Sequence, residues 1–99
     1  WERDCHAEEL PFTWNNAQWM YKYSDDEQAM SDELSAYWVN FAYTGHPDVG
    51  PAKDFPAHGL LSWPSYPLSG QEIVLSTDMK TVSDFLKDDC DFWDSVGYF

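Results

Sequence analysis

The sequence contains few basic residues: 5 Lys and Arg stand against 18 Asp and Glu, which gives a formal net charge of −13 at pH 7. Proteins that bind nucleic acid or anionic lipid need clustered Lys and Arg to contact phosphates, so this composition excludes both kinds of partner. No apolar run approaches the roughly 20 residues of a membrane-spanning helix. The sequence also lacks an Asn-x-Ser/Thr acceptor, which excludes N-glycosylation of these 99 residues.

Large aromatic side chains are abundant by contrast, with six Trp, six Tyr and six Phe. Disordered acidic segments contain few aromatic residues, so we expect these rings to be buried. A chain of 99 residues forms one small domain at most, and small domains bury a modest share of their surface. We therefore expect part of the apolar surface to pack against another polypeptide. We also expect a chain that starts at Trp1 to be cut from a longer precursor.

The clearest local pattern predicts a helix over Asp25–Thr44. Ser24 and Glu27 form a capping box, in which the hydroxyl and the carboxylate satisfy amides at the start of the helix. Apolar residues then recur at steps of three and four, which is typical of one buried helix face: Met30, Leu34, Tyr37, Trp38 and Phe41. Gly45 is a typical C-terminal cap, and Pro47 prevents continuation of the helix.

The second half of the chain contains less regular structure. Repeated Pro and Gly predict a loop over residues 46–63. The β-branched run at residues 72–76 predicts one strand, and a weaker apolar pattern predicts a helix over residues 85–96. Because a single strand has no partner for its backbone amides, we expect it to complete a sheet formed elsewhere rather than to dimerise.

Four short motifs occur in an order that resembles a known family. The run His6-Ala7-Glu8-Glu9-Leu10-Pro11-Phe12 looks like the catalytic-histidine segment of the type-B carboxylesterases and cholinesterases. Residues 27–48 resemble that family's helix and the Thr-Gly-x-Pro turn after it. Residues 63–66 resemble its Trp-Pro turn, and residues 90–94 its C-terminal Cys-x-Phe-Trp element. Each motif is weak alone, but together they cover nearly the whole chain. The resemblance departs at Ala7, where the family commonly has Gly, and at residues 13–15.

The resemblance implies an α/β fold in which residues 1–99 are the C-terminal segment of a single α/β-hydrolase domain. This segment would hold the last sheet strand, a long surface helix and the C-terminal helix, and it would not be an independent domain. His6 falls on the family's catalytic histidine, a general base and then a general acid. No Gly-x-Ser-x-Gly frame occurs here, so the serine and the acid of the triad would lie on an upstream chain of the same precursor.

The implied function is hydrolysis of a small-molecule or lipid carboxylic ester, without a metal or organic cofactor. Glu9 matches a Glu of the family and would support the active-site region. Two other chemistries are disfavoured: Glu8 and Glu9 are adjacent and rarely face one pocket, and Cys5, His6 and Glu9 lack the remaining ligands of a metal site. The acidic run at residues 84–94 lacks the spacing of a Ca²⁺ loop. Three aromatic residues could stack on a substrate, although packing is the commoner role: Trp14, Trp19 and Tyr21.

The two cysteines, Cys5 and Cys90, leave their connectivity open, because spacing alone permits a bridge between them or bridges to other cysteines. The resemblance favours two bridges to upstream cysteines. Disulfides would place the protein in an oxidising, secreted context.

Two other functional classes compete with hydrolysis. A non-catalytic adhesion protein of the same fold, as neuroligins are, would lack the upstream serine. An independent acidic binding module would unfold cooperatively as an isolated 99-residue chain.

Overall fold

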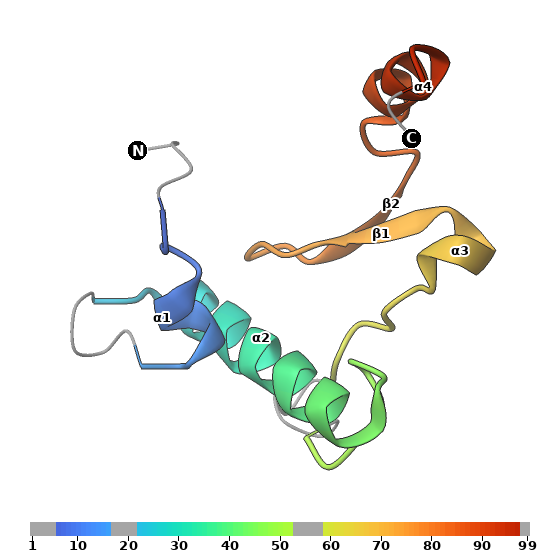
Figure 1. Ribbon diagram of the computed structural model, residues 1–99. Helices are drawn as coiled ribbons and strands as arrows, with labels where there is room; N and C mark the ends of the chain where they lie inside the picture. Colours follow the sequence, from blue (N-terminus) through green and yellow to red (C-terminus); the bar gives the residue numbers. More distant parts are fainter. Residues whose placement is uncertain (1–5, 17–21, 53–58, 98–99) are drawn as a thin grey trace.

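A computed structural model of the protein describes residues 6–16, 22–52 and 59–97 (Figure 1). Its helices and strands are, in chain order, α1 (Leu10–Thr13), α2 (Asp25–Thr44), α3 (Tyr66–Ser69), β1 (Gln71–Val74), β2 (Lys80–Ser83) and α4 (Lys87–Ser95). The short helix α1 packs on the N-terminal half of the long helix α2. The β1–β2 hairpin lies across from α2, and α4 lies beyond the hairpin, away from both helices (Figure 1).

The predicted bounds of α2 are confirmed, together with the capping that fixes them. The Ser24 hydroxyl accepts a hydrogen bond from the backbone N–H of Glu27 at 3.3 Å, and the Glu27 carboxylate accepts one from the backbone N–H of Ser24 at 2.7 Å. At the other end Gly45 adopts the left-handed conformation, with φ 77°, and its N–H donates to the Phe41 carbonyl at 2.8 Å. Both ends of α2 are therefore satisfied by residues next to them in the sequence.

The prediction of a single strand over residues 72–76 is wrong, because the structure has an antiparallel pair. β1 and β2 are joined by a short turn, and Ile73 of β1 stands opposite Thr81 of β2. The second strand, Lys-Thr-Val-Ser, carries one large apolar residue and lies largely exposed, so its sequence gave little strand signal. The expectation that this strand must find its partner outside the chain is therefore also wrong, because β1 pairs with β2 of the same chain.

The remaining elements agree with the prediction in part. The predicted C-terminal helix is confirmed as α4, which begins two residues later because Leu86 is left-handed, with φ 57°. The single-turn helices α1 and α3 were not predicted, and each has a proline in its first two positions. The loop expected over residues 46–63 is confirmed where the structure describes it, at residues 46–52 and 59–63.

The fold is open, and its core is small. The radius of gyration is 15.7 Å, whereas a compact domain of this length has a value of about 13 Å. The accessible surface is 7941 Å², against about 5,800 Å² for a compact protein of the same mass. Among the residues that the structure describes, the five buried ones all belong to α2: Ser31, Leu34, Ala36, Tyr37 and Asn40.

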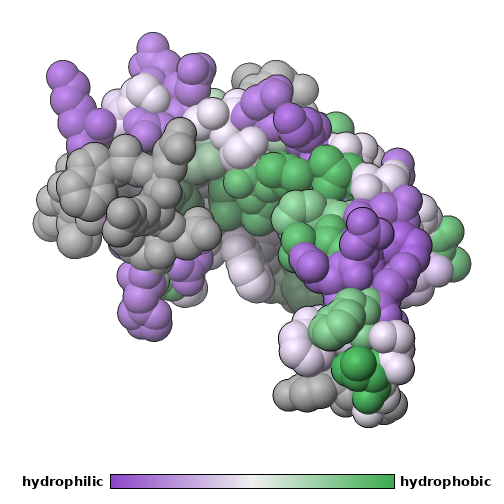
Figure 2. Space-filling view, turned by 90° about the horizontal axis from the view of Figure 1, so that it is seen from above, coloured by the Kyte–Doolittle hydropathy of each residue, from purple (hydrophilic) through white to green (hydrophobic). Residues whose placement is uncertain are grey.

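The apolar face of α2 is consequently covered only in part. Leu34 and Tyr37 are buried as predicted, but Trp38 and Phe41 remain 59% and 51% exposed. Figure 2 shows apolar side chains gathered in the middle of the face seen from above. The chain thus exposes roughly 2,000 Å² more surface than a compact protein of its mass would. None of the helices described has the length and apolar character needed to cross a membrane.

Candidate functional site

His6 lies in the turn that leads into α1, and its side chain is exposed. The next residue, Ala7, is left-handed, with φ 68°, a conformation that an L-residue with a Cβ atom adopts only at a cost. The Ala7 carbonyl accepts a hydrogen bond from the N–H of Leu10 at 3.3 Å, which closes the turn. Within the described part of the chain no hydrogen bond reaches the His6 imidazole. The ring is therefore open to a group from outside these residues.

Glu8 and Glu9 follow in the same turn, and both side chains are exposed. Glu9 is the residue before α1, and its backbone carbonyl accepts from the N–H of Thr13 at 2.9 Å. Its carboxylate makes no cap hydrogen bond, and no hydrogen bond joins either glutamate to His6. Support of the histidine by Glu9 stays a prediction.

A polar cluster, which we call the Asn15 cluster, joins the end of the histidine segment to α2; its members are Asn15, Gln28, Ser31 and Asp32. The Asn15 amide donates to Asp32 Oδ1 at 2.7 Å, and its oxygen accepts from Gln28 Nε2 at 2.8 Å. Gln28 also donates to the same Asp32 oxygen at 2.9 Å. Asn15 is left-handed, with φ 49°, which Asn tolerates better than most residues.

Ser31 is the buried member of the Asn15 cluster, with an exposed fraction of 0%. Its hydroxyl lies 2.8 Å from the carbonyl oxygen of Phe12 in α1 and 3.2 Å from the Asn15 side-chain oxygen. The Phe12 ring stacks on Tyr23, with 4.6 Å between ring centroids and 14° between ring planes. Hydrogen bonds and ring stacking therefore attach the histidine segment to the start of α2.

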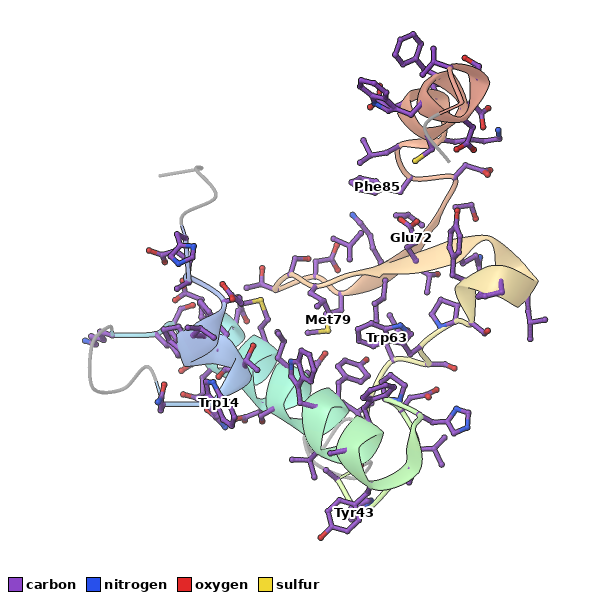
Figure 3. The ribbon with its side chains drawn as sticks, viewed as in Figure 1. Trp14, Tyr43, Trp63, Glu72, Met79 and Phe85 are labelled. Atoms are coloured by element: carbon purple, nitrogen blue, oxygen red, sulfur yellow. The ribbon has the colours of Figure 1, made fainter. Side chains whose placement is uncertain are left out.

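A second feature is an apolar cavity of about 270 Å³ toward the other end of α2. It is lined by Leu34, Tyr37, Trp38, Phe41, Pro47, Trp63 and Leu75. Figure 3 shows Trp63 and Met79 between α2 and the hairpin. None of these lining residues comes from the histidine segment. The structure therefore does not bring His6 and the cavity together.

Tyr37 of the cavity wall is buried and makes a ring contact and a hydrogen bond. Its ring meets Trp63 edge to face at 5.0 Å, and its hydroxyl donates to the Leu61 carbonyl at 2.7 Å. Burial, with added repulsion from the Glu33 and Asp48 carboxylates, raises the pKa of Tyr37 to about 12. The hydroxyl therefore stays protonated and acts as a donor at neutral pH.

The other candidate residues are placed only in part. Cys5, Trp19 and Tyr21 lie outside the described residues. Cys90 lies on α4 as an exposed, free thiol, and Trp14 at the end of α1 is 71% exposed. Among residues 6–16, 22–52 and 59–97, no group of three His, Cys, Asp or Glu side chains could hold a metal ion.

The Asn15 cluster was not predicted from the sequence. One signal for it exists, because Ser31 lies on the apolar face of α2, three residues before Leu34. A small polar residue on a face that becomes buried must find a hydrogen-bond partner. The identity of that partner could not be predicted, since Phe12 and Asn15 lie 19 and 16 residues away along the chain.

Comparison with known proteins places these features in context. A family model described as "Carboxylesterase family" matches residues 1–93. The chain is 24% identical to the medium-chain fatty acyl-CoA hydrolase precursor of Anas platyrhynchos over 88 residues, which are 89% of its length. It is 31% identical over 74 residues, 73% of this chain, to an acylcarnitine hydrolase of Rattus norvegicus. These matches span 14% and 12% of the two relatives' lengths.

A solved structure named PNB esterase is similar to 87% of this chain, with a TM-score of 0.65 and 24% sequence identity. The similarity covers 16% of that protein's chain. At this level of identity the comparison establishes a shared fold for this segment of structure.

Proposed function

Because the chain belongs to the carboxylesterase family, we propose that it is the C-terminal segment of a serine carboxylic-ester hydrolase and that His6 is the histidine of its catalytic triad. The observation that carries the proposal is the family match over residues 1–93, which includes the His6 segment. The two relatives described above are named as hydrolases of acyl compounds, a fatty acyl-CoA hydrolase and an acylcarnitine hydrolase. The exposed imidazole without a hydrogen-bond partner among the described residues is compatible with this role.

In the proposed reaction His6 accepts and then donates a proton in each of the two half-reactions. The imidazole first takes the hydroxyl proton of an upstream serine as the serine oxygen attacks the ester carbonyl, and it then gives that proton to the departing alcohol. In the second half His6 takes a proton from the water that attacks the acyl-enzyme and returns it to the serine oxygen as the acyl bond breaks and the carboxylic acid leaves. An upstream carboxylate would orient the ring, and Glu9 would support the surrounding turn.

The open fold supports the proposal that these residues complete a larger domain. About 2,000 Å² of surface beyond that of a compact protein is comparable to an obligate interface between two polypeptides. The half-exposed Trp38 and Phe41, beside the cavity, lie on the face that we propose to be covered. We propose the upstream part of the same protein as its cover, with bridges from Cys5 and Cys90 to upstream cysteines in a secreted protein.

The test uses the full-length protein with a chromogenic ester such as p-nitrophenyl acetate. We expect His6→Ala to lower kcat by about three orders of magnitude or more, since loss of a triad member removes the base for both steps. His46→Ala is the matched control, because His46 is also exposed and lies in the loop after α2, and we expect turnover within about twofold of wild type.

Two outcomes would contradict the proposal. Turnover of His6→Ala within about threefold of wild type would exclude His6 as the base. Wild-type protein without ester turnover would favour the non-catalytic, adhesion-type alternative.

A further inference from the structure

We propose that the Asn15 cluster positions the catalytic histidine, so that Asn15, Ser31 and Asp32 are positioning residues for the reaction. The inference rests on the proposed function, because it concerns how His6 is held for proton transfer. None of these residues touches the reacting atoms in this proposal. They act through the short helix α1, which follows His6 in the chain.

The turn that carries His6 cannot be held by its own local structure. Helix α1 has four residues, far fewer than the roughly 12 that an isolated helix needs for marginal stability. Ala7, directly after His6, is left-handed and persists in that conformation only when the surroundings impose it. The position of the imidazole therefore depends on what fixes α1.

The Asn15 cluster supplies that attachment. Among the described residues, the hydrogen bonds that join residues 6–16 to α2 all belong to it: Asn15 to Asp32, Gln28 to Asn15, and Ser31 to Phe12 and Asn15. Loss of the buried Ser31 hydroxyl would remove the donor that joins α2 to the Phe12 carbonyl and leave that carbonyl with the local N–H of Asn15 alone, which lowers the stability of this attachment.

The cluster also fixes the direction in which the chain leaves α1. Asn15 uses both its amide group and its oxygen in these bonds while its backbone is left-handed. The N–H of Asn15 donates to the Phe12 carbonyl at 3.1 Å, the same carbonyl that Ser31 contacts. Side-chain and backbone contacts thus converge at the end of α1, and a shift there would be transmitted to the turn that holds His6.

The consequence is a specific kinetic signature. A displaced base impairs proton transfer in the transition state, so kcat falls, while groups that bind the ester are untouched and KM stays constant. Misplacement of a catalytic group by about 1 Å can cost about 100-fold in rate. A purely structural role would instead reduce the amount of folded protein without changing kcat per folded molecule.

The experiment measures kcat and KM per folded molecule of the full-length protein with p-nitrophenyl acetate. We expect Asn15→Gly and Ser31→Ala to lower kcat by about 10- to 100-fold with KM within about twofold of wild type. Asn15→Gly keeps the left-handed backbone available and removes only the side chain. Asp32→Asn, which keeps an acceptor oxygen, should retain activity, whereas Asp32→Ala should lose it as the other variants do.

Tyr37→Phe is the matched control, since it also deletes a buried α2 hydroxyl that donates to a distant carbonyl, at Leu61. It should lower stability but leave kcat unchanged. Equal kcat in Ser31→Ala and Tyr37→Phe would overturn the inference, as would a rise in KM with constant kcat. If wild type lacks turnover or His6→Ala retains it, the proposed function fails and this inference with it. If His6→Ala is inactive while the cluster variants are fully active, only the inference fails.

Discussion

Replacement of Ala7 by glycine should stabilise the turn that carries His6. Ala7 has φ 68°, and the Cβ atom of an L-residue costs about 1–2 kcal/mol in the left-handed conformation. Glycine removes that cost but gives the unfolded chain more freedom, which offsets about 0.4–1 kcal/mol. The net gain is about 0.5–1 kcal/mol in the local opening free energy. Ala7→Val should have the opposite effect, because a β-branched residue is a true outlier at positive φ.

Amide hydrogen exchange of the full-length protein, followed in a peptide that covers residues 6–16, measures this local free energy. A gain of about 0.5–1 kcal/mol slows exchange about two- to fivefold. Asn15→Gly provides the internal comparison: Asn15 is also left-handed, at φ 49°, but its side chain makes hydrogen bonds. Glycine at position 7 should therefore slow amide exchange in this peptide, whereas glycine at position 15 should speed it. Faster exchange in Ala7→Gly would refute the inference that Ala7 is strained.

Three further outcomes are expected. Gly50→Ala should destabilise the full-length protein in urea by about 1–3 kcal/mol, because its Cβ atom would lie 2.6 Å from Asn40 Oδ1; an unchanged midpoint would contradict that close approach. Hydrogen bonds from Ser24 lower the pKa of Glu27 below 4.5 in the folded protein. The ionised carboxylate therefore stabilises the helix fully above pH 4.5, and this stabilisation is lost as the pH falls through the lowered pKa. The stability difference between wild type and Glu27→Gln should accordingly shrink below pH 4.5, and a constant difference would argue against the cap. Burial raises the pKa of Tyr37 from 10.0 to about 12, so its protonated form stabilises the fold and this contribution is lost as the pH rises between these values. The stability of Tyr37→Phe should therefore fall less steeply than that of wild type over this pH range, and equal slopes of stability against pH would contradict the raised pKa.

The helical part of the fold was predictable because its signals are local. The capping box at Ser24 and Glu27, with Gly45 and Pro47 at the far end, gave the bounds that α2 has in the structure. The weaker pattern near the C-terminus gave α4 within two residues. In each of these cases neighbouring residues supply the stabilising contacts, so a short stretch of sequence contains the information.

The elements that escaped prediction depend on contacts with distant residues or with an adjacent strand. β2 is stabilised by backbone pairing with β1, and its own sequence has little apolar character. α1 is a single turn that packs on α2, so its sequence alone lacks a helix signal. The hydrogen bonds of the Asn15 cluster that leave α2 join residues 13 to 19 positions apart in the sequence. The role of His6 came from the order of family motifs, and it stays a prediction because its proposed triad partners would lie outside this chain.

The exposed apolar face lies on a strongly charged chain, which has a consequence for self-association. Two copies that met through Trp38 and Phe41 would bring together two chains of net charge −13. Like charge of this size opposes pairing of copies and keeps molecules apart in solution. A less acidic surface faces no such penalty. Low salt should therefore suppress self-association of this chain, and high salt, which screens the repulsion, should promote it.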